Sequence, residues 1–250
     1  MAEGLRNENL DGPFKKSNED GTEDGIEELV REEVDENHIR LVRKRSLTKV
    51  DRRSYGPKKT LLHIAVDLQR MEVIKSLLQN GANPNFLDVK SKSPFHQAIL
   101  QNKTNIAFMM IQFGAGINFP TYLGKAPLPL AIMKKNEILV KALIEKGANV
   151  ERKDQYDRLS ALQLALEMGS MDEIVTMLIS NGANVNRRFP ISKNTPMHKA
   201  VSGKRKNCLK SLLDHGGDQS LKNKKGDTPI EVALEKKSIG MFKVLLYDQH

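Results

Sequence analysis

The amino-acid sequence predicts an all-α repeat solenoid, in which short helix-turn-helix pairs stack side by side. A hexapeptide of the form TPMHKA recurs with starts that lie 33, 33, 34, 35 and 33 residues apart. A triplet similar to Gly-Ala-Asn follows each of the first five hexapeptides 21 or 22 residues later. Two markers that share one period indicate that a single repeat builds the whole fold. The hexapeptides begin at Thr60, Ser93, Ala126, Ser160, Thr195 and Thr228, and the triplets at Gly81, Gly114, Gly147, Gly182 and Gly216.

The hexapeptide predicts the start of the first helix of each pair. Its Thr or Ser can accept hydrogen bonds from the backbone N–H groups of the first turn, and proline suits the next position because no N–H is needed there. Pro129 also falls within a first turn, so we expect it to remove no helical hydrogen bond. Leucine and alanine then share one face, as Leu61, Leu62 and Ala65 do.

The second helix of each pair shows apolar residues at i, i+3 and i+4, as in Val73, Leu77 and Leu78. The glycine of the triplet comes just after this run, where a left-handed C-cap is expected. Turn-rich segments such as 88–92 and 222–226 connect one pair to the next. Each unit is therefore a helix-turn-helix pair followed by a β-hairpin or turn, which we call a finger.

Charge divides the chain into three parts. Residues 1–38 carry thirteen acidic and four basic side chains, residues 39–59 carry nine basic and one acidic side chain, and the rest is mildly basic. We expect an acidic disordered head over 1–22 and, over 23–58, a helix that covers the apolar flank of the first repeat together with a basic collar. The repeat domain then occupies 59–250, with repeats at about 59–91, 92–124, 125–158, 159–193, 194–226 and 227–250.

The hexapeptide, the triplet and the period together resemble the ankyrin repeat family over residues 59–250. The resemblance implies helix pairs stacked into a curved slab, with a concave palm formed by the fingers and the first helices. Two departures are expected to stay local: the fourth repeat gains a residue near Gly169, and the finger at 187–194 gains one beside Phe189.

The histidines of the hexapeptide, His63, His96 and His198, are expected to be structural. The resemblance implies that they hydrogen-bond their own and neighbouring turns, and stacking separates them by repeat, which is unlike a metal site. The sequence also contains no phosphate-binding glycine loop, no HExxH, no GxSxG and no paired cysteines. We therefore expect a protein that is not an enzyme and needs no cofactor, with Cys208 as a buried thiol.

The fingers carry the candidate partner-binding residues. Basic side chains recur once per repeat and should line up along one edge, where electrostatics would favour an acidic segment of a partner protein, although a role in solubility alone explains these charges equally well. Aromatic residues near the same turns could supply apolar anchors. The candidate set is Lys90, Lys92, Tyr122, Lys125, Arg152, Lys153, Tyr156, Arg187, Arg188, Phe189, Lys222, Lys224 and Lys225.

Both ends of the chain suggest further contacts. The collar contains two basic clusters spaced like a nuclear-import address and a serine behind an arginine that basophilic kinases accept, although a solvated helix end explains it equally well. These residues are Arg43, Lys44, Arg45, Arg52 and Arg53 for import and Ser46 for phosphorylation. The last repeat still carries apolar residues, which predict an exposed apolar flank open to a contact. They are Met241, Phe242, Val244, Leu245 and Leu246.

These observations favour a non-enzymatic scaffold that binds a partner protein through palm and fingers. Nucleic-acid binding through the collar and the fingers is an alternative, although aromatic residues make up only 5% of the chain. Inhibitors of Rel-type transcription factors are similar in size and repeat number, so a regulator of that kind is a third alternative. With one cysteine and no long apolar run, the chain is expected in the cytoplasm, the nucleus or both, without membrane contact.

Overall fold

The protein is a single row of stacked helix pairs, as a computed structural model shows. The model describes residues 59–88, 90–121, 124–153, 158–169 and 171–247. Within these residues there are twelve helices and no strand. The first helices of the pairs are α3 (Leu61–Asp67), α5 (Pro94–Leu100), α7 (Pro127–Met133), α9 (Ala161–Met168), α11 (Pro196–Ser202) and α13 (Pro229–Glu235). The second helices are α4 (Met71–Gln79), α6 (Thr104–Gln112), α8 (Glu137–Glu145), α10 (Asp172–Ser180), α12 (Lys206–Asp214) and α14 (Ile239–Tyr247).

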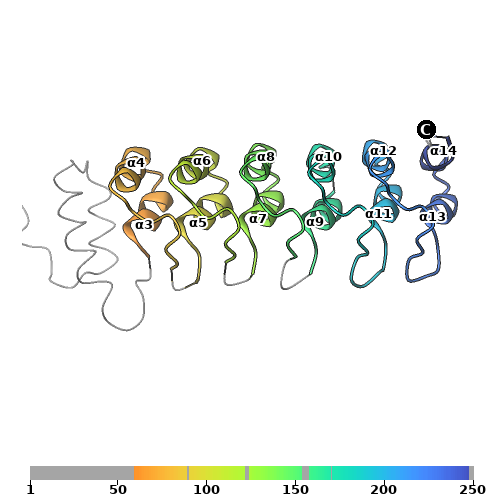
Figure 1. Ribbon diagram of the computed structural model, residues 1–250, viewed down its shortest axis with the longest axis horizontal. Coiled ribbons are helices and arrows are strands. Elements are labelled where there is room, and N and C mark those ends of the chain that lie inside the picture. The colour runs from red at the N-terminus through yellow and green to blue at the C-terminus, as the bar shows by residue number, and fades with distance from the viewer. Residues whose placement is uncertain (1–58, 89, 122–123, 154–157, 170, 248–250) are drawn as a thin grey trace, which may run out of the picture.

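The helices form two layers, and the fingers extend from the layer of first helices (Figure 1). Each first helix packs against the first helix of the next pair, and each second helix packs against the second helix of the next pair. The sixth residue of every hexapeptide is an alanine with no exposed surface, which leaves space for neighbouring helices to approach. These alanines are Ala65, Ala98, Ala131, Ala165, Ala200 and Ala233.

The first helices begin as the sequence predicts. Five of them have Thr or Ser at the N-cap in extended conformation, with a capping box to the third helical residue. The exception is α7, where Ala126 caps without a side-chain hydrogen bond. Pro129 is the third residue of α7, so its missing N–H costs no helical bond.

The hexapeptide histidines tie each helix start to the following finger. In His96 the Nδ1 atom accepts from the backbone N–H of Ser93 at 3.3 Å, and Nε2 donates to the carbonyl of Phe119 at 2.7 Å. His63 and His198 make the same pair of contacts and donate to the carbonyls of Lys92 and Asp227. The structural role expected for the three histidines is therefore confirmed.

Gln163 performs this function in the fourth repeat. Its Oε1 accepts from the backbone N–H of Ser160 at 3.0 Å, and its Nε2 donates to the carbonyl of Arg187 at 3.2 Å. An amide can replace the imidazole because both present one acceptor and one donor on opposite sides.

The two expected insertions are present. Helix α9 has eight residues where the other first helices have seven, and Gly169 ends it with a φ of 68°. In the α10–α11 finger the closing hydrogen bond joins Phe189 to Asn194, which spans one residue more than the bond between Asp88 and Lys92. The α6–α7 and α12–α13 fingers close through the same kind of bond, and none of the described finger residues forms a strand.

The expected apolar strip on the last repeat is largely wrong. Helix α14 packs against α12 and α13, so Met241, Val244 and Leu245 are at most 4% exposed. Leu246 does remain exposed, together with Leu234 and Ile239, which the prediction did not include. The head, the collar and the expected covering helix over 23–58 lie outside the described residues.

The neutral histidines predict an acid-sensitive fold. Burial lowers the pKa of His96 below its ordinary value of 6.5, so the unfolded chain takes up a proton at a pH where the folded chain does not. The stabilisation is present above about pH 6.5 and is lost as the pH falls below that value. We expect the urea midpoint to fall between about pH 7.5 and about pH 5.5, and to fall less in His96→Gln, which copies Gln163.

His215→Gln is the matched control because His215 is exposed at the end of α12. It should keep the pH dependence of the unmodified chain. If His96→Gln kept that dependence as well, the imidazole would not be held neutral by the fold.

Candidate functional site

The finger turns are held by their own side chains. Oδ1 of Asp88 accepts from the backbone N–H groups of Lys90 and Lys92, both at 2.8 Å. Asn223 repeats this arrangement with Lys225 at 2.8 Å and Asp227 at 3.1 Å. These short acceptors fix the backbone of each turn, and the side chains of Lys90 and Lys225 are exposed on it. The fingers therefore present cations from an ordered backbone.

Neighbouring fingers are connected at their bases by a ladder of asparagines. Asn85 donates from Nδ2 to the carbonyl of Gly114 at 3.0 Å and accepts from the N–H of Gly116. Asn118 and Asn186 each make the same two contacts with the repeat that follows their own. In the third repeat Glu151 takes this position and accepts from the N–H of Asn184 at 2.8 Å.

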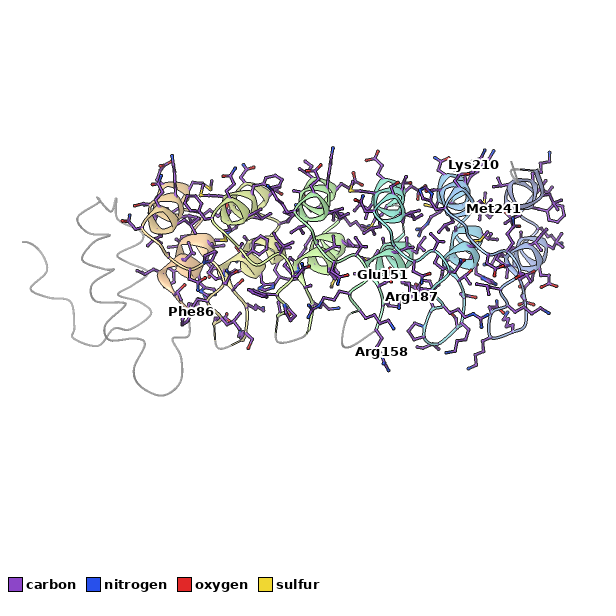
Figure 2. All side chains as sticks on the ribbon, in the orientation of Figure 1. Phe86, Glu151, Arg158, Arg187, Lys210 and Met241 are labelled. Carbon is purple, nitrogen blue, oxygen red and sulfur yellow. The ribbon has the colours of Figure 1, made fainter. Side chains whose placement is uncertain are left out.

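Two predicted partner-binding arginines belong to this ladder. Nη1 of Arg152 donates to the carbonyl of Asn118 at 3.0 Å, and Arg187 forms an ion pair with Glu151 (Figure 2). The side chain of Arg187 is 24% exposed, and its Nε is buried. These contacts indicate that Arg152 and Arg187 join neighbouring repeats, a role that the sequence prediction did not give them.

The prediction that Phe189 anchors a partner is wrong. Its side chain is 3% exposed and belongs to the core, and Nζ of Lys199 lies 4.9 Å from its ring centre. The additional residue in this finger folds the ring inward instead of presenting it. Lys199 also pairs with Glu167 at 2.5 Å, so α9, α11 and this finger meet at one polar contact.

The remaining candidates divide by exposure. Lys92 and Lys125 are partly buried, whereas Tyr122, Tyr156 and the whole collar, including Ser46, lie outside the described residues. The predicted residues that are exposed are Lys90, Lys153, Arg188, Lys222, Lys224 and Lys225.

The prediction omitted two exposed cations. Arg158 and Lys193 have positive φ values of 56° and 55°, at the turn position where Gly124 and Gly226 stand in other fingers. Arg158 extends away from the helices at its finger (Figure 2). Glycine is the usual residue in this conformation. The repeat period identifies the equivalent position in each finger, so a basic residue in place of glycine there could have revealed both cations from the sequence.

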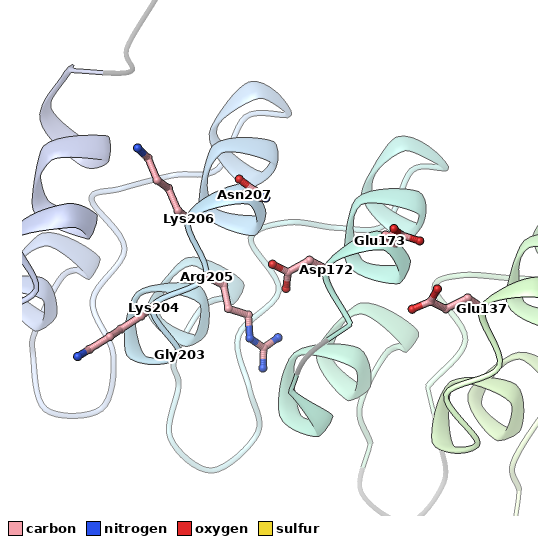
Figure 3. A pocket seen from close by; sticks show the side chains of 8 residues that line it. All are labelled: Glu137, Asp172, Glu173, Gly203, Lys204, Arg205, Lys206 and Asn207. Atoms are coloured by element: carbon pink, nitrogen blue, oxygen red, sulfur yellow. The ribbon is translucent and has the colours of Figure 1, made fainter.

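A shallow hollow of about 540 Å³ lies at the starts of α8, α10 and α12, away from the fingers. Figure 3 shows the carboxylates of Glu137, Asp172 and Glu173 on one side and Lys204, Arg205 and Lys206 on the other. Arg205 donates from Nη2 to the carbonyl of Leu166 at 2.9 Å, which connects α9 to the next repeat. The lining of the hollow thus has mixed charge.

Cys208 is a buried thiol, as expected. It has no exposed surface, and its Sγ donates to Oδ1 of Asp172 at 3.0 Å. Burial and the neighbouring carboxylate raise its pKa to about 12, so the thiolate is absent at neutral pH. In the described part of the chain no three His, Cys, Asp or Glu side chains are placed to bind one metal ion, and no helix is long and apolar enough to cross a bilayer.

The stacked pairs and their cationic turns define a repeat protein of the kind that works through side chains on an extended surface. A family model described as ankyrin repeats in three copies matches residues 62–154, 95–189 and 162–250. The chain belongs to the ankyrin repeat family, whose repeats are generally protein–protein interaction modules.

Solved structures of this family match most of the chain. The ankyrin repeat domain of Bcl-3, a member of the IkappaB protein family, superposes with a TM-score of 0.71 at 26% identity, over 88% of this chain and 96% of that domain. The ankyrin repeat domain of human ASB11 superposes with a TM-score of 0.59 at 26% identity, over 75% of this chain and 82% of that domain.

Curated relatives match shorter stretches. A putative ankyrin repeat protein, L271 of Acanthamoeba polyphaga mimivirus, is 33% identical over 86 residues, which are 33% of this chain and 12% of the viral protein. Human ankyrin repeat and SOCS box protein 6 is 34% identical over 88 residues, which are 35% of this chain and 21% of that protein. The matches thus cover a small part of these relatives.

The ladder predicts that Glu151 matters more for stability than an exposed arginine does. Glu151→Ala removes the acceptor for Arg187 and for the N–H of Asn184, so we expect a loss of about 1 to 3 kcal/mol in the free energy of unfolding. Arg188→Ala should change it by less than about 0.5 kcal/mol because that side chain is exposed. Urea denaturation measures both.

Glu151→Gln retains an acceptor oxygen and should recover part of the loss. Equal, small losses for Glu151→Ala and Arg188→Ala would contradict the role given to the ladder.

Proposed function

We propose that the protein is a non-enzymatic scaffold that binds a partner protein bearing an acidic segment, through its palm and fingers. The observation that carries this proposal is the set of exposed cations on the last two fingers, which belong to turns held in place by their own hydrogen bonds. Arg188 and Lys193 lie in the α10–α11 finger, and Lys222, Lys224 and Lys225 lie in the α12–α13 finger.

The last two fingers are also connected directly. The backbone N–H of Lys224 donates to the carbonyl of Ser192 at 2.9 Å. This bond fixes the positions of the two turns, and of the cations on them, relative to each other. Preorganised charges steer an oppositely charged partner and add to the rate of association. Exposed ion pairs such as Lys225 with Glu235 at 3.8 Å contribute little by themselves and do not remove these charges from the surface.

A regulator of Rel-type transcription factors is a second candidate. It is supported by the superposition on the Bcl-3 domain, which covers nearly all of that domain. A pull-down with purified Rel-type dimers tests it directly, and absence of binding at micromolar concentrations would remove it.

The cytoplasm and the nucleus are the proposed locations, since one cysteine suits a reducing compartment. Arg43, Lys44, Arg45, Arg52 and Arg53 are the candidate import residues, and Ser46 is a candidate phosphorylation site. Nucleic acid is the competing ligand for the same cations, and its binding would fall steeply with salt.

Charge reversal on the fingers tests the proposal. We expect Arg188→Glu, Lys222→Glu and Lys224→Glu together to weaken binding of a fluorescent polyglutamate peptide by about tenfold or more, because three attractive charges become repulsive. The control, Lys75→Glu, Lys141→Glu and Lys243→Glu, makes the same change in net charge on exposed residues of second helices.

Fluorescence anisotropy at two salt concentrations gives the affinities. Equal losses in both triple variants would show that net charge alone attracts the peptide and would overturn the proposal. If an RNA oligonucleotide binds more tightly than the peptide and also loses affinity in the finger variant, the nucleic-acid alternative is favoured.

A further inference from the structure

The palm has polar contacts at both ends of the stack. Counted from the N-cap, the fifth and eighth residues of the first helices meet across neighbouring repeats. At one end the eighth residue Asp67 accepts from Nε2 of Gln97, the fifth residue of the next helix, and also from Gln101 at 2.5 Å. At the other end the eighth residue Glu167 pairs with the fifth residue Lys199. Because Lys199 also lies over the ring of Phe189, these positions face the fingers.

Between these polar contacts the same positions are apolar. The eighth residues of α5 and α7 are Leu100 and Met133, and the fifth residues of α7 and α9 are Leu130 and Leu164. Met133 is 40% exposed, Leu100 and Leu164 are partly buried, and Leu130 is 3% exposed. The register that joins Asp67 to Gln97 therefore places two apolar pairs, Leu100 with Leu130 and Met133 with Leu164, in the middle of the palm.

The charge on the fingers is arranged asymmetrically around this apolar patch. In the α6–α7 finger, Phe119 is 59% exposed, and its ring lies against Gly116 of the same finger. Exposed cations are more numerous toward the C-terminal repeats, because the α4–α5 finger carries Lys90, the α8–α9 finger carries Lys153 and Arg158, and the last two fingers carry five. A ligand that extends from the patch toward the C-terminal repeats therefore meets most of the exposed positive charge of the fingers after the apolar side chains.

The spacing of the repeats restricts the conformation of such a ligand. Packed helices lie about 8 to 10 Å apart, and a polyproline II helix advances about 9 Å in one turn of three residues. Side chains at i and i+3 of such a segment share one face and match successive repeats. A flat β-strand is a poorer match, because residues three apart point to opposite faces.

We propose that the palm between α5 and α9 binds an extended partner segment in polyproline II conformation, with apolar side chains at i and i+3 and acidic residues toward the last two fingers. This inference rests on the proposed function and adds to it the spacing of the apolar residues and the order of the two chemistries. Charge complementarity favours this occupant, since the basic fingers repel a basic segment and give an entirely apolar one no counter-charge.

The test uses the full chain and synthetic fluorescent peptides. The probe has leucines three residues apart with prolines between them, followed by glutamates; a second peptide has the reverse order, and a third has its leucines only two residues apart. We expect one of the first two peptides to bind the unmodified chain. Met133→Gln should weaken the affinity for that peptide about tenfold, which is the effect of losing one apolar contact. The third peptide, with its leucines only two residues apart, should bind more weakly by a similar factor.

Ile138→Gln is the control, because Ile138 is 68% exposed on a second helix, and it should leave the affinity unchanged. If polyglutamate binds as tightly as the leucine peptides, or if Met133→Gln and the shifted leucine have no effect, the inference is overturned while the proposed function stands. If neither the leucine peptides nor polyglutamate binds, both are overturned.

Discussion

One interaction recurs in four of the six repeats and ties the helices to the fingers, namely the hydrogen bond that a hexapeptide side chain donates to the carbonyl of the following finger. The same side chain accepts from the backbone N–H of its own N-cap, so a single residue fixes both the helix start and the finger relative to it. A residue with one donor and one acceptor on opposite sides can make both bonds, as His96 and Gln163 do. The fingers keep their positions because the helices behind them are held in this way.

The polar side chains of the fingers have two different roles. Those nearest the helices, among them Asn85, Glu151 and Arg187, are used between neighbouring repeats. Those further out, such as Arg188 and Lys222, are exposed. The residues proposed for partner binding are thus different from those that join neighbouring repeats, so a change of the first kind leaves the contacts of the second kind in place. The apolar middle of the palm is different, because Met133 has an exposed part while neighbours such as Leu130 are buried in the core.

The sequence predicted the fold well because every repeat carries the alanine, most carry the same cap and the same glycine, and two markers keep one period. It predicted the site less well, because the partners of Arg152 and Arg187 lie in the preceding repeat, about one period away. Basic composition could not distinguish these arginines from Arg188. The burial of Phe189 follows from an additional residue whose effect on the turn no pattern of hydrophobicity records. The burial of Met241 and Leu245 depends on how α14 settles against α12 and α13.

The identity of the fourth hexapeptide residue differs along the stack, and this difference affects the order in which the repeats unfold in acid. Imidazoles serve the first, second and fifth repeats, whereas Pro129 and Gln163 occupy the third and fourth and cannot gain a proton in mild acid. Since each repeat is stabilised mainly by its neighbours, mild acid should loosen the flanks while the centre stays folded. Such a molecule would unfold in stages, and the third and fourth repeats would stay folded longer than the repeats on either side of them.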